Sequence, residues 1–195
     1  MTVIALEGID NCMKSTLALD LCELLGKSKY KVVLFSYPDL STPIGQLIHQ
    51  ALQGRISIHD ASLAMLFAAN RIESIEDVTK YLSQGYCVLF DRYSASNVAY
   101  GQSKNLNKQW LENLDGLAIE PDLVMYIDAE PERQAGFYFK HDIHDDYSYQ
   151  KKVKEHYMEL LNSDSRWLTF DKNLPYSVLR DQMFNVIKAV LEVSQ

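Results

Sequence analysis

The chain has 195 residues, 47% of them hydrophobic, and a formal net charge of −7. This length supports one sizeable core and is short for two ordinary domains, so we predict a single domain over 1–195. The acidic balance provides no global basic field and argues against nucleic acid as a partner.

The sequence gives no indication of a membrane or secreted protein. No run reaches the roughly 18 apolar residues of a membrane span, and residues 1–8 lack the pattern of a signal peptide. The three cysteines, Cys12, Cys22 and Cys87, are an odd number at wide spacing. They fit neither a disulfide framework nor a zinc site. We therefore expect a cytoplasmic protein with no membrane partner.

Short apolar runs bounded by turn residues or charge predict buried β-strands. These runs are Val3–Leu6, Lys31–Ser36, Tyr86–Phe90, Leu123–Ile127 and Trp167–Phe170. The segments between them are long enough for crossover helices, which predicts an α/β three-layer sandwich with a five-stranded parallel sheet and helices on both faces. Ligands of such folds bind at the carboxyl ends of the strands.

A phosphate-binding loop is predicted directly after the first strand. The pattern G-x-x-x-x-G-K-[ST] is met at Gly8, Lys14 and Ser15, but its second glycine is Met13. Such a loop wraps phosphate in backbone N–H groups at a helix N-terminus, and glycine there permits close approach. We predict a P-loop NTPase-type fold that binds ATP, with Lys14 on the β- and γ-phosphates and Ser15 on Mg²⁺. The predicted ATP-binding residues are Gly8, Asn11, Cys12, Met13, Lys14, Ser15 and Thr16.

Two helices are predicted after the second strand. Thr42-Pro43 has the pattern of an N-cap followed by proline at the first helical position. Ser57 and Asp60 resemble a capping box, and one long helix is then expected from about Ile58 to Leu82. Its section Ala61–Ala69 is apolar nearly all round, which predicts burial by the sheet, a partner subunit or both.

Two pairs of residues offer chemistry suited to an acceptor. Asp91 and Arg92 follow the third strand, where Asp91 would lie near a metal or the attacking oxygen and Arg92 would clamp a phosphate. A structural ion pair is the alternative. Phe67 and Arg71 lie one turn apart on a helix face and suit a nucleobase, unless they are a core residue and a salt bridge.

Four segments resemble the thymidylate kinase family in order and spacing. Leu66–Glu73 is similar to L-F-x-A-N-R-x-E, and Asp91–Tyr100 to D-R-Y-x-x-S-x-x-A-[YF]. Ser41–Gly45 is similar to S-T-x-I-G, and Pro121–Val124 to P-D-L-[VT]. The resemblance implies phosphorylation of dTMP to dTDP by ATP for nucleotide biosynthesis, with Mg²⁺, and a homodimer packed through helices that include Ile58–Leu82.

The resemblance also implies roles for single residues. Phe67 would stack on thymine, Arg71 would bond to its carbonyl oxygen and Arg92 would hold the monophosphate. Ser96 would lie beside the base, and Tyr100 would crowd the sugar 2′ position. The implied substrate-binding residues are Asp10, Pro38, Phe67, Arg71, Arg92, Ser96, Tyr100 and Gln150.

Three of these residues carry further expectations. Asp10 is expected near the substrate 3′-hydroxyl, Pro38 follows a candidate cis peptide bond, and Gln150 would approach the base through water. The implied catalytic residues are Lys14, Asp91, Arg92 and Asp10, and the implied metal-binding residues are Ser15 and Asp91.

The sequence departs from the family where arginines are expected. Leu40 stands in place of the arginine of the F-P-x-R run, and Asn11 provides no arginine in the phosphate loop. The lid segment, at about 136–148, also lacks the arginine of the bacterial D-R-x-E pattern. An arginine at such a transition state contributes a factor of about 10³ to 10⁵ in rate. Arg133 and Lys140 are candidate substitutes, unless both are solvated charges.

Two alternatives to a dTMP kinase follow from these departures. Leu40 and the altered lid favour a deoxynucleoside monophosphate kinase of broad or shifted specificity. Met13 and the missing arginines favour a catalytically silent paralogue that binds nucleotide. We favour the enzyme, because the residues of the phosphate loop, strand end and helix face survive together whereas decay would scatter losses among them.

Overall fold

A computed structural model describes residues 1–131 and 147–193. In these residues five parallel strands form one sheet in the order β2-β3-β1-β4-β5. The strands are β1 (Thr2–Glu7), β2 (Val32–Ser36), β3 (Cys87–Asp91), β4 (Leu123–Asp128) and β5 (Trp167–Asp171). All the predicted strands and the parallel α/β architecture are confirmed.

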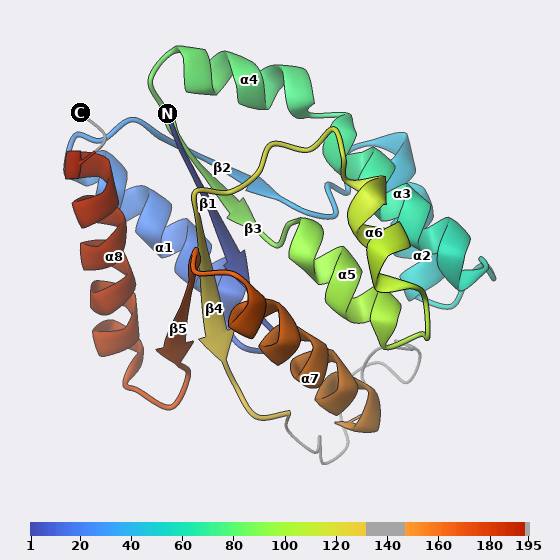
Figure 1. The fold of residues 1–195 in the computed structure, drawn as a ribbon. Coiled ribbons are helices and arrows are strands. Elements are labelled where there is room, and N and C mark those ends of the chain that lie inside the picture. The colour runs from blue at the N-terminus through green and yellow to red at the C-terminus, as the bar shows by residue number, and fades with distance from the viewer. Residues whose placement is uncertain (132–146, 194–195) are drawn as a thin grey trace.

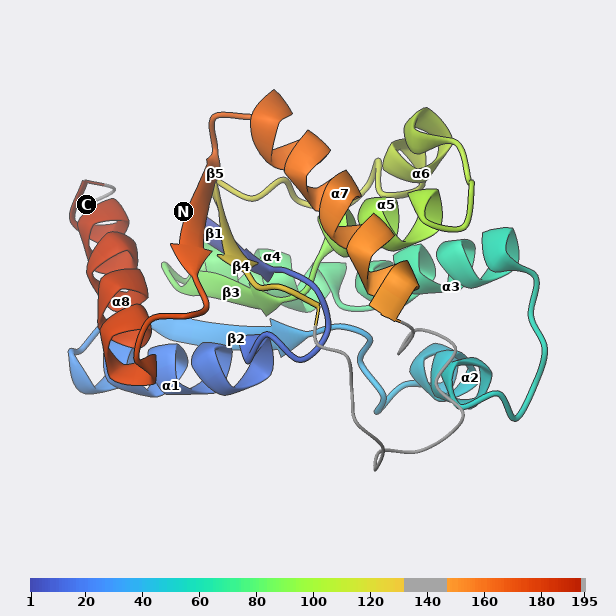
Figure 2. The same ribbon diagram turned by 90° about the horizontal axis from the view of Figure 1, so that it is seen from below.

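Helices cover both faces of the sheet (Figures 1 and 2). The described helices are α1 (Lys14–Lys27), α2 (Pro43–Leu52), α3 (Asp60–Ile72), α4 (Ile75–Ser83), α5 (Ser94–Gln102), α6 (Lys108–Leu114), α7 (Tyr147–Ser163) and α8 (Tyr176–Val193). One face carries α1 and α8, and the other carries α4, α5 and α7. Among the described helices, none has the length and apolar character needed to cross a membrane.

The alternation of side chains along β3 divides the core. Leu89 belongs to the cluster that includes the buried residues of α1 and α8, whereas Val88 and Phe90 pack with Val78 and Leu82 of α4. Successive residues of a strand point to opposite faces. The carboxyl ends of β1 and β3 therefore present side chains to both helical layers. We predicted that ligands bind at these strand ends.

The prediction of one long helix from Ile58 to Leu82 was wrong. The chain turns at Glu73-Ser74, and this turn separates two helices, α3 and α4. The Ser74 hydroxyl donates to the carbonyl of Arg71 at 3.0 Å. The division allows α4 to pack on β3 while α3 packs on α2 and α5. A single straight helix could not follow both directions.

The helix starts show one further difference from expectation. Thr42 caps α2 as predicted, since its hydroxyl accepts from the backbone N–H of Gly45 at 3.0 Å and Pro43 occupies the first turn. The capping box at Ser57 was wrong: His59 caps α3, and its Nδ1 accepts from the N–H of Ala61. A ring nitrogen two residues before the donating N–H replaces the expected hydroxyl as the acceptor.

Candidate active site

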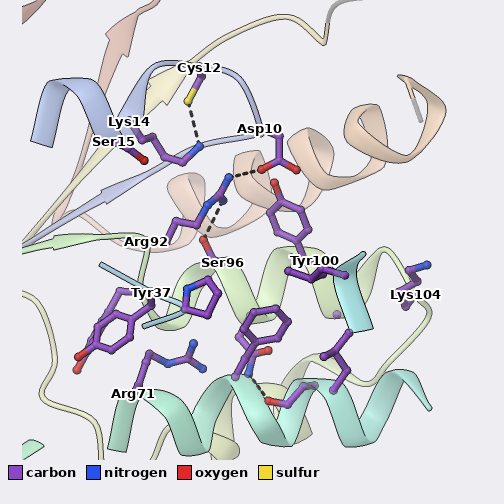
Figure 3. A pocket seen from close by; sticks show the side chains of 18 of the residues that line it. Asp10, Cys12, Lys14, Ser15, Tyr37, Arg71, Arg92, Ser96, Tyr100 and Lys104 are labelled. Carbon is purple, nitrogen blue, oxygen red and sulfur yellow. Dashed lines mark hydrogen bonds and ion pairs between the residues drawn. The ribbon is translucent and has the colours of Figure 1, made fainter. Parts of the chain in front are cut away.

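The cavity around the phosphate loop has a volume of about 540 Å³, within the range typical of small-molecule sites. It joins the loop to the walls formed by α3 and α5, as Figure 3 shows. The lining residues are Asp10, Asn11, Cys12, Met13, Lys14, Ser15, Thr16, Tyr37, Pro38, Leu52, Asp60, Leu63, Ala64, Phe67, Arg71, Arg92, Tyr93, Ser96, Asn97, Tyr100, Gly101, Lys104, Leu106 and Tyr149.

The phosphate loop keeps its path through its backbone conformation. A Cβ atom on Gly8 would lie 2.8 Å from the carbonyl oxygen of Ile127 and 2.9 Å from Sγ of Cys12, so a side chain does not fit there. Asn11 and Met13 both adopt positive φ, at 61° and 69°. Met13 thus occupies the left-handed conformation that glycine accepts freely, at a cost of roughly 1–2 kcal/mol. The methionine is tolerated as the N-cap of α1, and helix α1 still begins at Lys14.

Lys14 is buried at the start of α1. Its Nζ donates to the carbonyl of Ile9 and lies 3.3 Å from Sγ of Cys12. Burial, followed by repulsion from Arg92, lowers the pKa of Lys14 below its ordinary value. The N-terminus of α1 faces the cavity through Ser15 and Thr16, so the helix dipole and the lysine both favour an anion at this end.

Asp91 is the other residue expected at the metal. It is 7% exposed, and the alternation along β3 places its side chain on the α1 face with Leu89. Within residues 1–131 and 147–193, Oδ1 of Asp91 is buried without a hydrogen-bond partner. A carboxylate oxygen of this kind and the Ser15 hydroxyl are the hard oxygen ligands that Mg²⁺ prefers. Their chemistry fits the ion, although Asp91 is not a lining residue of the cavity.

Arg92 lies between the phosphate loop and helix α5 (Figure 3). Its Nη2 forms an ion pair with Asp10, and its Nη1 donates to the carbonyl of Gly8 at 3.2 Å and to Oγ of Ser96 at 3.3 Å. Its guanidinium lies 5.3 Å from the centre of the Tyr100 ring. Although burial opposes the charge, Tyr100 and Asp10 raise the pKa of Arg92 well above its ordinary value. The φ of 63° at Arg92 is a strained conformation at the end of β3.

Asp10 is held from two sides. Besides its ion pair with Arg92, Oδ2 accepts from Nε2 of Gln150 at 2.7 Å, and its N–H donates to Oε1 of Gln150 at 3.1 Å. Burial would raise the pKa of Asp10, but Arg92 and Lys14 outweigh it and lower the pKa. Gln150, on α7, therefore contacts Asp10 and is not a lining residue of the cavity.

The fully buried carboxylate of Glu7 fixes the start of α5. Its Oε1 accepts from the backbone N–H groups of Tyr93 and Ser96 at 2.8 and 3.2 Å. Its Oε2 accepts from the hydroxyls of Ser96 and Tyr157 at 2.6 and 2.8 Å. A negative charge at a helix N-terminus is favourable, so Glu7 holds the segment that carries Arg92.

The acceptor wall is built from α3 and the segment that follows β2. Arg71 is buried and forms a bidentate ion pair with Asp115 at 2.7 and 2.8 Å. Phe67, one turn earlier on α3, lines the cavity, as does Pro38, whose peptide bond with Tyr37 is cis.

Asn70 ties this wall together. Its Oδ1 accepts from the N–H of Asp39 at 2.7 Å, and its Nδ2 donates to Oγ1 of Thr42 and to Oε2 of Glu73 at 2.9 and 3.0 Å. Asn70 is 1% exposed, so these hydrogen bonds form in a protected environment. Leu40, where an arginine was expected, is 39% exposed and does not line the cavity.

Comparison with known proteins decides the family. The family model described as Thymidylate kinase matches residues 6–183. The chain belongs to the thymidylate kinase family. It is 34% identical over 170 residues to the thymidylate kinase of Plasmodium falciparum (isolate 3D7), covering 86% of this chain and 80% of that protein. It is 30% identical over 174 residues to the human thymidylate kinase, covering 87% and 81%.

Two further matches show how much is shared. The thymidylate kinase of Arabidopsis thaliana is 34% identical over 167 residues, covering 85% of this chain but 62% of that longer protein. The solved structure of thymidylate kinase from Candida albicans has a TM-score of 0.80 and 30% sequence identity, covering 96% of this chain and 91% of that chain. The family fold therefore extends over nearly the whole chain.

The structure brings most of the residues expected from the phosphate-loop pattern and from the family resemblance to one cavity. The expected residues on its lining are Asp10, Asn11, Cys12, Met13, Lys14, Ser15, Thr16, Pro38, Phe67, Arg71, Arg92, Ser96 and Tyr100. Gly8 and Gln150 do not line the cavity but contact the lining residues Arg92 and Asp10. Asp91 does not line it either and directly precedes Arg92 in the chain. The predicted lid segment lies outside the described residues except for 147–148, which begin α7, and the candidate substitutes Arg133 and Lys140 lie outside them too.

Sequence reasoning missed several lining residues. Asn97 follows Ser96 within the matched segment, and Tyr37 precedes Pro38, so the thymidylate kinase pattern itself could have indicated both. Lys104 and Tyr149 come from a turn and from α7, and Lys104 Nζ lies 4.9 Å from the centre of the Tyr149 ring. No pattern in the sequence joins these two positions.

Proposed function

We propose that this protein transfers the γ-phosphoryl group of ATP to dTMP, which yields dTDP and ADP. The observation that carries the proposal is the position of Arg92. Its guanidinium contacts the phosphate loop at Gly8 and Asp10 and helix α5 at Ser96, within one cavity. Membership of the thymidylate kinase family supports the same reaction.

The donor side would bind the phosphates of ATP. The backbone of the loop and the N-terminus of α1 offer N–H groups, and Lys14 would place its charge on the β- and γ-phosphates. Ser15 and Asp91 would hold Mg²⁺, which neutralises phosphate charge when bound. The phosphates would also hold the proton on Lys14 against the burial that lowers its pKa.

The acceptor side would recognise a pyrimidine with two carbonyl groups. Phe67 would stack on the ring, and Arg71 would donate to a base carbonyl. The Nδ2 of Asn97 donates to the carbonyl of Ala64 at 3.2 Å, which leaves Oδ1 to accept from the N3–H of thymine. A donor and an acceptor arranged in this way would favour thymine over cytosine, because cytosine lacks the N3–H.

The deoxyribose would lie between these two sides. The Asp10 carboxylate would accept from the 3′-hydroxyl, and Tyr100 would occupy the space that a 2′-hydroxyl needs. Both residues line the cavity next to Arg92, which would clamp the monophosphate.

The chemistry would be an in-line displacement. An oxygen of the dTMP phosphate forms a bond to the γ-phosphorus, and the bond from that phosphorus to the bridging oxygen of ADP breaks. The protein forms no covalent intermediate in this reaction, so its contribution would be positioning by Arg92 and charge neutralisation by Lys14.

Assembly and location stay predictions. A homodimer through the segment Ile58–Leu82 agrees with the 49% exposure of Met65 on α3, and sedimentation equilibrium measures it directly. We also expect Mg²⁺ dependence and a cytoplasmic location. Removal of the metal with a chelator should abolish turnover, and added Mg²⁺ should restore it.

A coupled assay of ADP release tests the proposed function. The protein with Mg²⁺ and ATP should convert dTMP with a higher kcat/KM than dUMP, dCMP or dGMP, and should leave thymidine unchanged. The thymidylate kinase of Candida albicans is described as having broad substrate specificity, so dGMP belongs in the panel. Absence of turnover with every monophosphate would refute the proposal, and binding without turnover would identify a silent paralogue.

A further inference from the structure

Arg71 and Asp115 are brought together from two helices. Arg71 lies in the last turn of α3, and Asp115 is the C-cap of α6. Nε and Nη2 of Arg71 donate to Oδ1 and Oδ2 of Asp115 at 2.7 and 2.8 Å. The two side chains are 3% and 6% exposed. Two parallel hydrogen bonds of this kind fix the plane of the guanidinium as well as its position.

The backbone of Arg71 is fixed at the same time. The Ser74 hydroxyl donates to the Arg71 carbonyl at 3.0 Å, and the same hydroxyl contacts the Tyr37 hydroxyl. The turn that divides α3 from α4 therefore holds the main chain of Arg71, while Asp115 holds its head group. An arginine side chain has several rotatable bonds, and ordering both of its ends removes most of its freedom.

The pair leaves one part of the guanidinium for a ligand. Arginine has five N–H donors in a planar fork, and within the described part of the chain the hydrogen bonds to Asp115 use Nε and Nη2. Arg71 lines the cavity, and Figure 3 shows it beside Tyr37 on the wall opposite Lys14. Nη1 is therefore the nitrogen that Asp115 leaves unused.

We infer that Asp115 is a positioning residue, which aims Nη1 of Arg71 at one carbonyl oxygen of the acceptor base and so sets the base preference. This inference rests on the proposed function, in which Arg71 contacts the base. Asp115 does not line the cavity, and it acts through the guanidinium. Without the carboxylate the head group can turn, and a rotation of the fork displaces a donor by more than a hydrogen bond tolerates.

A purely structural Asp115 would behave differently. If the pair only joined α3 to α6, its loss would lower the stability of the protein and would weaken the binding of every acceptor equally. If Asp115 aims Arg71, its loss weakens binding most for acceptors that offer a good carbonyl at the contacted position. The coupling between Asp115 and that carbonyl separates the two roles.

The experiment is calorimetric binding of dTMP, 2-thio-dTMP and 4-thio-dTMP to the full chain, because sulfur is a poor acceptor and both analogues keep the N3–H. In the unchanged protein we expect one thio analogue to bind about tenfold more weakly than dTMP, the loss typical of one hydrogen bond. In Asp115→Asn, dTMP should bind about tenfold more weakly and the penalty for that analogue should fall below about threefold.

The matched control is Asp164→Asn, which removes an aspartate from a surface pair with Arg166. It should bind all three ligands like the unchanged protein. Asp115→Glu keeps the charge on a longer side chain and displaces the fork, so it should also lose the analogue penalty even if Asp115→Asn fails to fold.

Three outcomes contradict the account at different levels. An undiminished analogue penalty in both Asp115 variants overturns the positioning role. The absence of any penalty in the unchanged protein also overturns it, because Arg71 then contacts no carbonyl. Failure of the unchanged protein to bind dTMP refutes the proposed function instead.

Discussion

The phosphate loop and the acceptor wall belong to one cavity but keep their shapes by different means. In the loop, Gly8 and Met13 adopt positive φ, so the path depends on backbone conformation. In the wall, Asn70 and the pair of Arg71 with Asp115 hold the chain through side-chain hydrogen bonds. A loop of the first kind tolerates a new side chain if the backbone conformation survives, whereas a wall of the second kind depends on the identity of each residue.

The largest effect should come from Arg92, which contacts the phosphate loop at Gly8 and helix α5 at Ser96. Arg92→Met removes the cation shared by the loop, Asp10 and the proposed acceptor phosphate, and we expect kcat/KM for dTMP to fall by about 10³-fold. Steady-state ADP release measures this loss. Arg166→Met, at a surface ion pair, is the control and should lose less than twofold. A loss below tenfold in Arg92→Met would contradict the proposed role of Arg92 at the acceptor phosphate.

Gly8→Ala tests the backbone side of the comparison. The added Cβ would meet the Ile127 carbonyl and Cys12 Sγ at less than 3.0 Å, so the loop must shift. A shift of about 1 Å can cost about 10²-fold in rate, and we expect that loss in kcat/KM for ATP. Gly26→Ala, with nothing within 4 Å of the new atom, should keep full activity. Equal activity of the two variants would contradict the account.

Asn70→Asp tests the acceptor wall, which depends on side-chain hydrogen bonds. The variant keeps Oδ1 for the N–H of Asp39 but loses the donor to Thr42 and brings a charge beside Glu73. We expect a loss of about 1–3 kcal/mol in the free energy of unfolding and about a tenfold rise in KM for dTMP, with KM for ATP unchanged. Chemical denaturation and steady-state kinetics measure both. An equal rise in the two KM values would show that the wall is not a separate unit.

Met13 should give a smaller effect, because the conformation and not the side chain matters. Met13→Val puts a β-branched residue at positive φ and should lower the free energy of unfolding by about 1–2 kcal/mol. Met13→Gly relieves the backbone strain but raises the conformational entropy of the unfolded chain. These effects oppose each other, so the free energy of unfolding should change by less than about 1 kcal/mol. Thermal unfolding of both variants provides the measurement, and a valine variant as stable as the glycine variant would refute the conformational account.

The smallest effect concerns acid stability. The pKa of Asp10 in the folded protein lies below its ordinary value. The contribution of Asp10 is therefore present above the unfolded pKa and is lost as the pH falls through the folded pKa. The stability difference between the unchanged protein and Asp10→Asn should shrink as the pH falls below about 4. A difference that stays constant from pH 6 to pH 3 would contradict this.

The sequence predicted what depends on local pattern. The strands are continuous apolar runs, Thr42-Pro43 has a recognisable capping pattern, and Lys14 follows a glycine at fixed spacing. Those features need only neighbours along the chain. The resemblance to the thymidylate kinase family added the residues of the acceptor side.

The missed features depend on contacts between distant segments. Arg71 and Asp115 are 44 positions apart, and nothing in either neighbourhood indicates the other. The predicted long helix is divided because α4 packs on the sheet while α3 packs on α2. The hydrophobic periodicity of the segment does not predict these two packing directions. Met13 adopts a positive φ, which is unusual for a residue other than glycine. The sequence pattern therefore counts Met13 as a mismatch to the phosphate-loop motif. Only the backbone conformation shows that the loop keeps its shape.

The most direct test compares turnover of dTMP by the unchanged protein and by Met13→Gly at saturating ATP and Mg²⁺. If backbone conformation completes the phosphate loop, the unchanged protein should turn over dTMP at a kcat of about 1–100 s⁻¹, within tenfold of the glycine variant. If the unchanged protein binds dTMP without releasing ADP, and Met13→Gly restores release, the loop is broken and the account is wrong.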